Sequence, residues 1–432
     1  MKNNSNLIKD LNGLLSAART SYQAMKTDRL SKFLGKINSI SDYQKIPPTT
    51  KEDFYDFNLS KKFSYVKRSR LDENGKEPIL PLTEDDYWRY VESEVGRFKA
   101  MGVKKTDRIS VVNFTINETI PIVNSLMKLG ATYIVTEGDV NLICDDLIKK
   151  EVNVIFTYHR MLEKIIEHLE SRSLKLALRL VIVTAEPIDD KNLLKKRVKK
   201  VLGADLIDTI GTREIGGYAY ECPEKNCYHF LDSLYVETVD PETKAVTSKA
   251  GELLITPLWR KDLPLIRFAT RDLVKLEQKT CSCKVKNNLV FKKVLGRINE
   301  NVKIGYSMVD LREVYFETKK LINYQYPVID NLFLRIAPSL NFSLLLSNEK
   351  ETDILIIFVE RSKFNRYLRR KRIITESLSA KFNIGVEIVL LSSNDFSKLS
   401  NNKYLDIRYI KKNRIPKYLL KILNQQSMSF DL

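Results

Sequence analysis

The stretch Arg108 to Thr136, RISVVNFTINETIPIVNSLMKLGATYIVT, indicates the fold class of this chain of 432 residues. It contains two short runs rich in β-branched residues, RISVVNF (108–114) and ATYIVT (131–136), which are typical of strands. Between them, NETIPIVNSLMKLG (117–130) has apolar residues at helical spacing and ends in a glycine, as many helices do. A strand, a helix and a second strand in this order predict a parallel βαβ unit.

The same alternation continues to Gly211. Three further strand-like runs are VNVIFTY (152–158), LRLVIVTAE (178–186) and ADLIDTIG (204–211). Helical patterns separate them at DVNLICDDLIKKE (139–151), MLEKIIEHLESRS (161–173) and DDKNLLKKRVKKVLG (189–203). The sequence therefore predicts a mostly parallel sheet that is covered by helices.

After Gly217 the pattern changes to short strands joined by turns. Strands are predicted at GELLITPLW (251–259), LIRFATRDLVKL (265–276) and NLVFKKVLG (288–296). Beyond residue 298, helices are predicted at 310–322 and 363–382, and strands at 342–346, 353–360 and 386–391. We therefore predict an α/β fold with a large N-terminal domain (1–298) of helix-covered, mostly parallel sheets. It includes a β-rich subdomain (about 218–298), and a small α+β C-terminal domain (299–432) follows on a hinge.

Composition places the chain among folded proteins, because 43% of its residues are hydrophobic and 29% are charged. Five cysteines are too few for a disulfide framework, and the opening residues MKNNSNLIKDLNGLL lack an apolar signal core. Charged or amide residues interrupt every long apolar run, so no membrane span is predicted. We expect a cytoplasmic protein.

The net charge of +18 is concentrated near the C-terminus, where residues 361–432 include 16 basic and 5 acidic residues, a net charge of +11. A basic surface attracts acidic partners, and an acidic carrier protein is one such partner. Nucleic acid is a less favoured partner, because the basic clusters at Arg366–Arg372 and Lys411–Lys417 come without a nucleic-acid-binding motif. A homodimer is also considered.

Four segments carry polar residues that suit a binding site: DTIGTREIGG (208–217), PLIRFATRD (264–272), GRINENVKIG (296–305) and NNKYLDIR (401–408). In the first of these, Thr212 and Glu214 follow a predicted strand. Ligands of open α/β sheets bind just outside the carboxyl ends of the strands, so these two side chains are expected at a crevice.

Taken in order, the four segments resemble those of the adenylate-forming superfamily, in particular its phenylacetate-coenzyme A ligase branch. Further matches agree with that branch's motifs. Ile46–Asp53 (IPPTTKED) is similar to "LPfTtKeDl", Thr184–Pro187 (TAEP) to "GAEP", and Glu221–His229 to "EC…H"; Asp240–Leu253 is similar to "DPeTG…GEL", and Pro264–Asp272 to "PLIRYRTrDL". Several spaced matches in one order are more specific than any single motif.

The resemblance implies an AMP-forming ligase. Family members activate a carboxylate with ATP as an acyl-adenylate and then transfer the acyl group to the thiol of coenzyme A. We expect the acid to be small and of aromatic or similar type, and the acceptor to be coenzyme A or a carrier-protein thiol.

The resemblance also assigns residues to roles. Glu214 would hold Mg²⁺, which prefers oxygen ligands, and Asp272 would accept hydrogen bonds from the ribose hydroxyls. Lys403 would bridge phosphate and carboxylate during adenylation. The remaining residues implied are Ala185, Glu186, Pro187, Gly211, Thr212, Arg297 and Lys76 for the nucleotide, Asn299 and Glu300 for the hinge, and Tyr158, His159 and Gly216 for the acyl pocket.

One element departs from the family pattern. A loop rich in glycines and hydroxyls, of the type TSGTTGKP, is expected between residues 65 and 78, where this chain has KRSRLDENGKEP (67–78). A phosphate cradle needs backbone amides turned toward the anion, and acidic side chains repel phosphate. Smaller departures are Thr184 for glycine, Ile210 for tyrosine and Asn299-Glu300 for an Asp pair. They leave open a divergent relative without ATP activation, either an acyl or amide-forming transferase or a nucleotide-binding protein.

Cysteines and a histidine in the β-rich region are candidate zinc ligands. Cys222, His229, Cys281 and Cys283 supply three thiolates and one imidazole, which suit a tetrahedral structural site, and Cys227 is a competing ligand. The alternative is a set of reduced, partly buried thiols.

Overall fold

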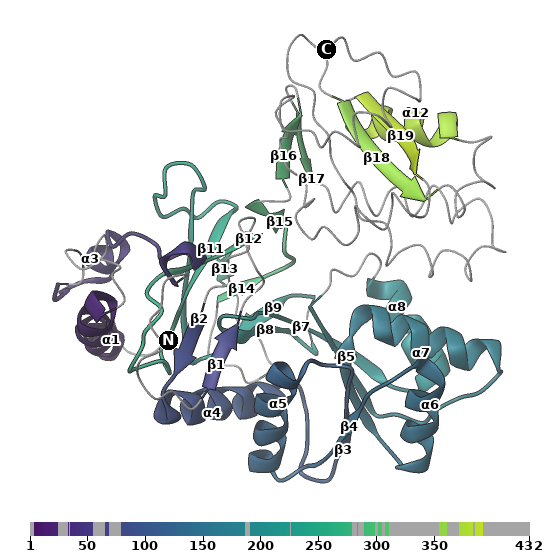
Figure 1. The fold of residues 1–432 in the computed structure, drawn as a ribbon. Helices are drawn as coiled ribbons and strands as arrows, with labels where there is room; N and C mark the ends of the chain where they lie inside the picture. Colours follow the sequence, from purple (N-terminus) through teal and green to yellow (C-terminus); the bar gives the residue numbers. More distant parts are fainter. Residues whose placement is uncertain are drawn as a thin grey trace. The chain divides into compact units, whose positions relative to one another are not determined.

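The computed structural model describes residues 4–24, 33, 35–54, 65–68, 79–185, 191–224, 226–278, 283, 289–298, 301–304, 307–310, 354–360, 371–382 and 385–391. The backbone divides into two compact units, residues 1–295 and residues 296–432, and we describe each by itself. Figure 1 labels most of the helices and strands of both.

A nine-stranded sheet forms the centre of the first unit, with the strand order β13-β14-β9-β8-β7-β6-β5-β3-β4 (Figure 1). The strands from β3 to β7 run parallel, and those from β7 to β13 run antiparallel to their neighbours. Their bounds are β3 (Arg108–Val112), β4 (Thr132–Thr136), β5 (Val154–Tyr158), β6 (Leu180–Thr184), β7 (Asp205–Thr212), β8 (Gly216–Glu221), β9 (Tyr228–Phe230), β13 (Glu277–Gln278) and β14 (Leu289–Phe291). The predicted α/β class with a parallel-containing sheet is confirmed.

The change of direction after β7 has a simple cause. Only residues 213–215 separate β7 from β8, and a connection this short can join antiparallel strands but not parallel ones. The region 218–298, predicted to be β-rich, therefore contributes strands to the central sheet as well as to a second sheet.

The order of the parallel strands creates a switch point. β3 lies between β4 and β5, so the chain leaves β3 in one direction and later returns to its other side. Helices cover both faces: α4 and α5 pack on one core, and α6, α7 and α8 pack on the other. Ligands of such sheets bind at the carboxyl ends of strands beside the switch point, which here are the ends of β3 and β5.

The helices begin and end at residues that the sequence explains. Thr83 caps α4, with its hydroxyl accepting from the Asp86 amide at 3.2 Å, and Asp139 caps α6 in the same way. Gly130 closes α5 with a positive φ of 85°, as predicted. The helix bounds are α1 (Asn4–Ala24), α3 (Ile40–Gln44), the 3-10 helix η1 (Lys51–Phe54), α4 (Glu84–Ala100), α5 (Ile116–Leu129), α6 (Val140–Lys149), α7 (His159–Ser171) and α8 (Lys191–Leu202). Among the described segments, no helix is long and apolar enough to span a membrane.

A second, antiparallel sheet contains β10 (Leu234–Val239), β11 (Gly251–Pro257) and β12 (Phe268–Val274). A separate antiparallel pair consists of β1 (Tyr65–Arg68) and β2 (Ile79–Leu82). An N-terminal segment lies along the start of β12, because Thr49 pairs with Phe268 as a bridge and donates its hydroxyl to the Ile266 carbonyl at 2.8 Å. The buried Arg267 guanidinium also donates to the carbonyl of Ile46.

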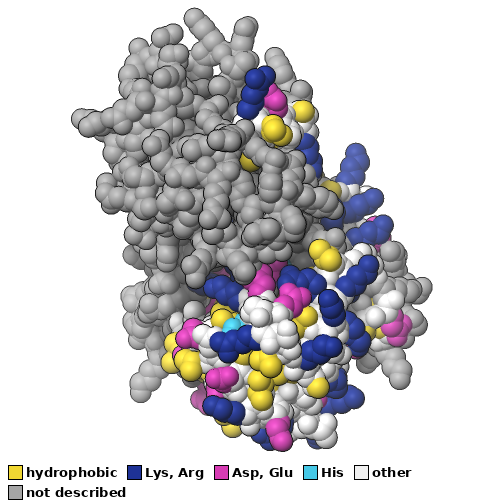
Figure 2. All heavy atoms as spheres, turned by 90° about the vertical axis from the view of Figure 1, so that its right-hand side faces the viewer, with side chains coloured by type: hydrophobic (Ala, Val, Ile, Leu, Met, Phe, Trp, Pro, Cys, Tyr) yellow, Lys and Arg dark blue, Asp and Glu magenta, His cyan; other side chains and the backbone are white. Residues whose placement is uncertain are grey.

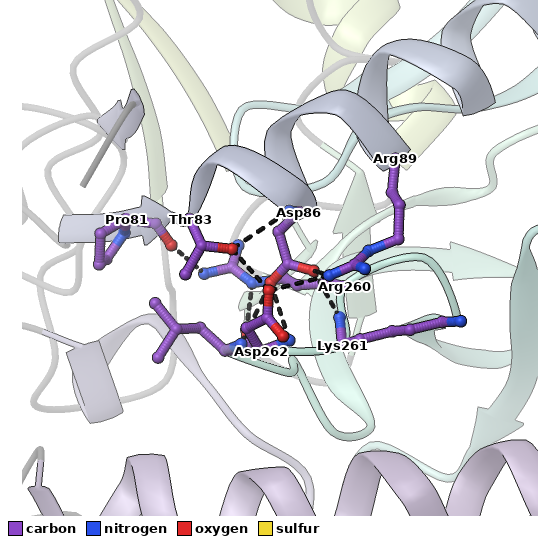
Figure 3. Close-up of polar contacts among 8 residues, drawn as sticks. Pro81, Thr83, Asp86, Arg89, Arg260, Lys261 and Asp262 are labelled. Atoms are coloured by element: carbon purple, nitrogen blue, oxygen red, sulfur yellow. Dashed lines mark hydrogen bonds and ion pairs between the residues drawn. The ribbon is translucent and has the colours of Figure 1, made fainter. Parts of the chain in front are cut away.

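A polar cluster fastens the start of α4 to the loop between β11 and β12 (Figure 3). The Asp86 carboxylate accepts hydrogen bonds from the backbone amides of residues 261, 262 and 263 at 2.7, 3.0 and 3.2 Å. Arg89 contacts Asp86 and Asp262, and Arg260 donates to the Pro81 carbonyl at 2.9 Å. A fully buried carboxylate with several charged and amide donors keeps this joint rigid.

The second unit includes β15 (Gly296–Arg297), an antiparallel hairpin of β16 (Asn301–Ile304) and β17 (Ser307–Asp310), and a βαβ element. In that element β18 (Ile354–Glu360) pairs in parallel with β19 (Gly385–Leu391), and α12 (Lys371–Phe382) connects them. The strands predicted at 353–360 and 386–391 are confirmed, and the predicted helix at 363–382 is confirmed over residues 371–382. The helix predicted at 310–322 and the strand at 342–346 lie outside the described residues.

Candidate functional site

The turn between β7 and β8 presents the first predicted site residues. Thr212 ends β7, Gly216 begins β8, and Glu214 lies between them with 2% of its surface exposed. Two glycines allow this tight turn. A Cβ on Gly211 would lie 2.5 Å from the Gly216 carbonyl oxygen, and Gly216 has a φ of +98° with the ring of Tyr90 pressed against it. Gly211, Thr212, Glu214 and Gly216 thus form one rigid corner.

Helix η1 brings charged residues to this corner. The Lys51 ammonium lies 2.8 Å from the Glu214 carboxylate, and the Glu52 carboxylate lies 2.6 Å from the Arg271 guanidinium. Arg271 directly precedes Asp272 on β12. Two consecutive residues of η1 therefore connect the β7–β8 turn with β12, and that connection joins both predicted nucleotide-binding elements.

Asp272 itself is linked to β8. Its Oδ2 accepts a hydrogen bond from the Tyr218 hydroxyl at 2.8 Å, and both side chains are buried. An ionised carboxylate offers about four lone-pair sites, so it can accept from more than one donor. Tyr218 fixes where that carboxylate points.

Aromatic residues lie at the carboxyl ends of β3 and β5, the switch point of the sheet. The Tyr158 ring packs against Phe114 with ring centroids 4.5 Å apart, and the Tyr158 hydroxyl donates to Glu118 at 2.7 Å. The Arg213 side chain lies 3.8 Å from the other oxygen of Glu118. Because Arg213 is the neighbour of Glu214, this aromatic group lies beside the β7–β8 turn.

His159 is placed differently from Tyr158. It is buried in the first turn of α7, with its Nε2 atom 3.7 Å from Glu163 on the same helix. Ala185 follows β6 with a φ of +74°, a strained conformation for a residue with a Cβ. Six other non-glycine residues among those described have a positive φ, so this strain does not by itself mark a nucleotide site, and the role expected of Ala185 stays a prediction.

A buried cluster of charges lies between β7 and α8. Asp208 accepts a hydrogen bond from the Tyr228 hydroxyl, and the Lys191 ammonium lies 3.6 Å from its carboxylate. Lys191 and Lys195 also contact Glu221, at 3.4 and 2.8 Å. Burial raises the pKa of Asp208 to about 6, against the attraction of Lys191. Figure 2 shows that the surface over α6, α7 and α8 carries many Lys and Arg side chains with acidic ones among them.

Three of the predicted metal ligands come together. The ligand atoms of Cys222, His229 and Cys283 lie within 4.8 Å of one another, and the Cys283 sulfur is 3.1 Å from the His229 Nε2 atom. Zinc bound to sulfur at about 2.3 Å and to nitrogen at about 2.0 Å needs ligand atoms this close. Cys227 is buried beside Cys222 but is not part of this triad. The chemistry and spacing of the donors fit zinc.

Other predicted residues cannot be placed at the site. Arg297 is in the second unit, on β15. Outside the described residues lie Lys76, Glu186, Pro187, Cys281, Asn299, Glu300 and Lys403. The whole glycine-poor segment 69–78 is among the residues not described.

Four contributors were not assigned a role from the sequence: Lys51, Glu118, Arg213 and Tyr218. Lys51 is part of the IPPTTKED motif, which was a usable signal. Glu118 also had a usable sequence signal. It lies three residues after the Thr115 N-cap of α5 and forms a capping box with it. Nothing in the local sequence marks Tyr218 as a partner of a residue 54 positions away.

Comparison with known proteins agrees with the motif resemblance. A phenylacetate-coenzyme A ligase of Pseudomonas putida is 28% identical over 264 residues, which cover 56% of this chain and 58% of that protein. The Escherichia coli (strain K12) protein of the same name is 28% identical over 258 residues, covering 55% of this chain and 58% of that enzyme. The chain is a homologue of phenylacetate-coenzyme A ligases. The match spans somewhat over half the length of these curated relatives, and no protein-family model matches the chain.

Solved structures place this ligase homologue in the fold of acyl-coenzyme A ligases. A 2-hydroxyisobutyryl-CoA ligase in complex with an acyl-AMP ligand has a TM-score of 0.66 at 14% identity, covering 98% of this chain and 91% of that structure. The anthranilate CoA ligase AuaEII in complex with anthranoyl-AMP has a TM-score of 0.54 at 15% identity, covering 78% and 66%. At these identities the likeness concerns the fold.

Proposed function

We propose that the chain is an AMP-forming ligase that joins a small carboxylic acid to coenzyme A. The proposal is supported by two ion pairs of η1: Lys51 pairs with Glu214, and Glu52 pairs with Arg271, which directly precedes Asp272. Tyr158 and Phe114 lie next to the same corner. The ends of parallel strands are where α/β proteins bind ligands, which supports a site for a nucleotide and an acid here.

The reaction has two steps. The substrate carboxylate attacks the α-phosphorus of ATP, so a carboxyl–phosphate bond forms and pyrophosphate leaves. The thiolate of coenzyme A then attacks the acyl carbonyl carbon, a thioester forms and AMP leaves with the electron pair. Both steps bring negative groups together, so the site must supply positive charge.

The described side chains of the first unit suit these steps. Asp272, oriented by Tyr218, accepts hydrogen bonds from the ribose hydroxyls of the nucleotide. Lys51 and Arg213 bring positive charge to the corner that holds Glu214, and we propose that Lys403 and Arg297 supply more. Tyr158 and Phe114 offer two packed aromatic rings, so we favour a small aromatic acid.

Magnesium stays a prediction. Glu214 is the acidic residue proposed to hold it, but the Lys51 ammonium already lies at its Oε1 atom and repels a second cation there. The Oε1 atom of Glu214 therefore does not fit a magnesium ion, and no step of the proposed reaction depends on the metal.

Carboxylate-dependent exchange of labelled pyrophosphate into ATP tests the ligase, with a panel of small aromatic and aliphatic acids. We expect exchange with at least one acid. Tyr218→Phe should raise the KM for ATP several-fold while the protein stays folded, because it frees the Asp272 carboxylate to turn. Tyr235→Phe changes a partly buried tyrosine of β10; it is the control and should leave the KM unchanged. A folded wild-type protein that gives no exchange with any acid contradicts the proposal.

A second candidate keeps the nucleotide site without ATP activation, as an acyl or amide-forming transferase or a nucleotide-binding protein. Two observations favour it: the glycine-poor sequence at 67–78, which carries Asp72 and Glu73 in place of glycines and hydroxyls, and the lysine already paired with Glu214. Calorimetric titration with AMP, ATP and a nonhydrolysable acyl-adenylate separates the two. Tight binding of the analogue with negligible binding of ATP favours this candidate over the ligase.

We also propose a structural zinc ion held by Cys222, His229 and Cys283, with Cys281 as the fourth ligand. Zinc would fasten the loop that carries Cys283 to β8 and β9, and four protein ligands would leave it no open position for catalysis. A carrier-protein acceptor and a cytoplasmic location remain predictions from the sequence. Nucleic-acid binding remains the least favoured interpretation.

A further inference from the structure

An exposed apolar surface lies at the open edge of the nine-stranded sheet. β4 is the outermost strand at this end, and its Tyr133 and Val135 side chains are 37% and 41% exposed. Proteins usually protect an edge strand with lysine, proline or a bulge. β4 reads Thr-Tyr-Ile-Val-Thr and has none of these.

Helix α5 enlarges this surface. Ile116, Ile120, Val123 and Met127 recur at spacings of three and four residues and therefore share one face of the helix. Ile116 and Met127 are 72% and 57% exposed. On the opposite flank, Ser125 donates to a carbonyl of α4 at 3.3 Å, so the apolar face is turned away from α4.

The strand and the helix form one surface. Tyr133 and Val135 pair in register with Ile109 and Val111, which belong to the core on the α5 side of the sheet. Side chains in register on adjacent parallel strands point to the same face. We call this continuous patch the edge surface; it consists of Ile116, Ile120, Val123, Met127, Tyr133 and Val135.

We propose that the edge surface binds a second copy of the chain, by antiparallel pairing of β4 with β4 of that copy about a two-fold axis at Ile134. The strand is nearly palindromic, so the axis pairs Tyr133 with Val135 and Thr132 with Thr136. Aromatic and β-branched residues facing each other across strands stabilise such a pair. This proposal does not depend on the proposed enzymatic activity.

The backbone amide and carbonyl groups of β4 that face the open edge are those that this axis requires. On the inner side, the Thr132 amide donates to the Asp107 carbonyl and the Asn113 amide donates to the Thr136 carbonyl, each at 3.0 Å. Alternate residues bond to opposite sides of a strand, so Tyr133 and Val135 direct their amide and carbonyl groups to the open edge. About the proposed axis, Tyr133 of one copy and Val135 of the other exchange both hydrogen bonds.

Charge at the two ends of β4 favours a second copy over another partner. Glu137, exposed, directly follows the strand, and the Lys105 side chain packs against Gly130, which precedes it. The two-fold axis places Glu137 opposite Ala131 of the other copy, beside that copy's Lys105. Glu137 of each copy therefore lies near Lys105 of the other, so the dimer has two such contacts between opposite charges.

The oligomeric state of the full chain gives the first test. Sedimentation equilibrium at micromolar concentration should give twice the mass of one chain. Val135→Lys should give single chains, because it places two ammonium groups at the paired edge. Leu193→Lys changes an equally apolar, exposed residue on α8 and should remain a dimer. A wild-type monomer, or a dimeric Val135→Lys variant, overturns the proposal.

A cross-linking variant and a charge swap test the register. Residues that face each other in a non-hydrogen-bonded antiparallel pair have Cα atoms about 4.5 Å apart, within the range of a disulfide. Ile134→Cys should therefore cross-link two chains on mild oxidation, while wild-type protein does not. Lys105→Glu and Glu137→Lys should each weaken the dimer by about tenfold, and the double variant should restore it. Absence of the cross-link in a folded dimer refutes this register.

Discussion

The ammonium of Lys51 and the carboxylate of Glu214, 163 positions apart in sequence, form an ion pair of 2.8 Å in which the carboxylate is almost completely buried. Removing the lysine leaves a buried anion without this partner. We expect Lys51→Met to lower the free energy of unfolding by about 2 kcal/mol, measured by urea denaturation. The control is Lys45→Met, which breaks an exposed pair with Asp42 and should cost less than about 1 kcal/mol. Equal losses of unfolding free energy in the two variants would show that the Lys51–Glu214 pair stabilises the protein no more than an exposed pair does.

Asp208 should give the protein a characteristic pH dependence. Burial raises its pKa from 3.8 to about 6, so the folded protein binds the proton more tightly than the unfolded chain. The stability that Asp208 contributes is therefore present below about pH 4 and is lost as the pH rises to about 6, by roughly 3 kcal/mol at most. Urea denaturation at several pH values should show a smaller fall over this window for Asp208→Asn. Asp205→Asn, at an exposed position on the same strand, should keep the wild-type slope.

Zinc content tests the Cys222, His229 and Cys283 triad. Protein purified without chelators should contain one zinc ion per chain by elemental analysis, and Cys222→Ser should lose it together with several degrees of thermal stability. Cys227→Ser changes a buried thiol next to the triad and should retain the metal. Zinc-free wild-type protein, or loss of zinc from both variants alike, would be inconsistent with this ligand set.

Gly216 should tolerate no side chain. An alanine there would combine a φ of +98° with Cβ contacts of 2.5 to 2.9 Å to the Tyr90 ring, so Gly216→Ala should destabilise the protein by at least about 1 kcal/mol and abolish pyrophosphate exchange. Gly96→Ala is the matched control. Gly96 lies within α4 with open space around its Cα, so alanine should stabilise the protein by up to about 1 kcal/mol. A Gly216→Ala variant as stable and active as wild type would refute the close packing of residue 216 against Tyr90.

The sequence predicted those features that repeat along the chain. The strand–helix alternation from Arg108 to Gly211 was correct within about two residues at most boundaries, because β-branched runs and helical periodicity are local signals. It also predicted that Thr212 and Glu214 follow a strand. It did not predict that β8 and β9 extend the parallel sheet, because alternation marks a strand without indicating the sheet it joins.

Contacts between distant segments could not be predicted either. The pairing of Lys51 with Glu214 and of Tyr218 with Asp272 depends on how η1, β8 and β12 pack. The residues next to them in sequence do not indicate these partners. The cysteine pattern suggested a metal site, but only packing separates Cys222 from Cys227 as a candidate ligand.

The Asp86 joint of Figure 3 has a consequence for biosynthesis. Helix α4 leaves the ribosome long before residues 261–263, whose amides saturate the Asp86 carboxylate 175 to 177 positions upstream. At translation rates of about 5–20 residues per second, the nascent chain waits roughly 10 to 35 seconds before that carboxylate can be buried with its partners. The Asp86 joint can therefore form only after most of the first unit has been synthesised, and chaperones that shield its unfinished core have that interval in which to act.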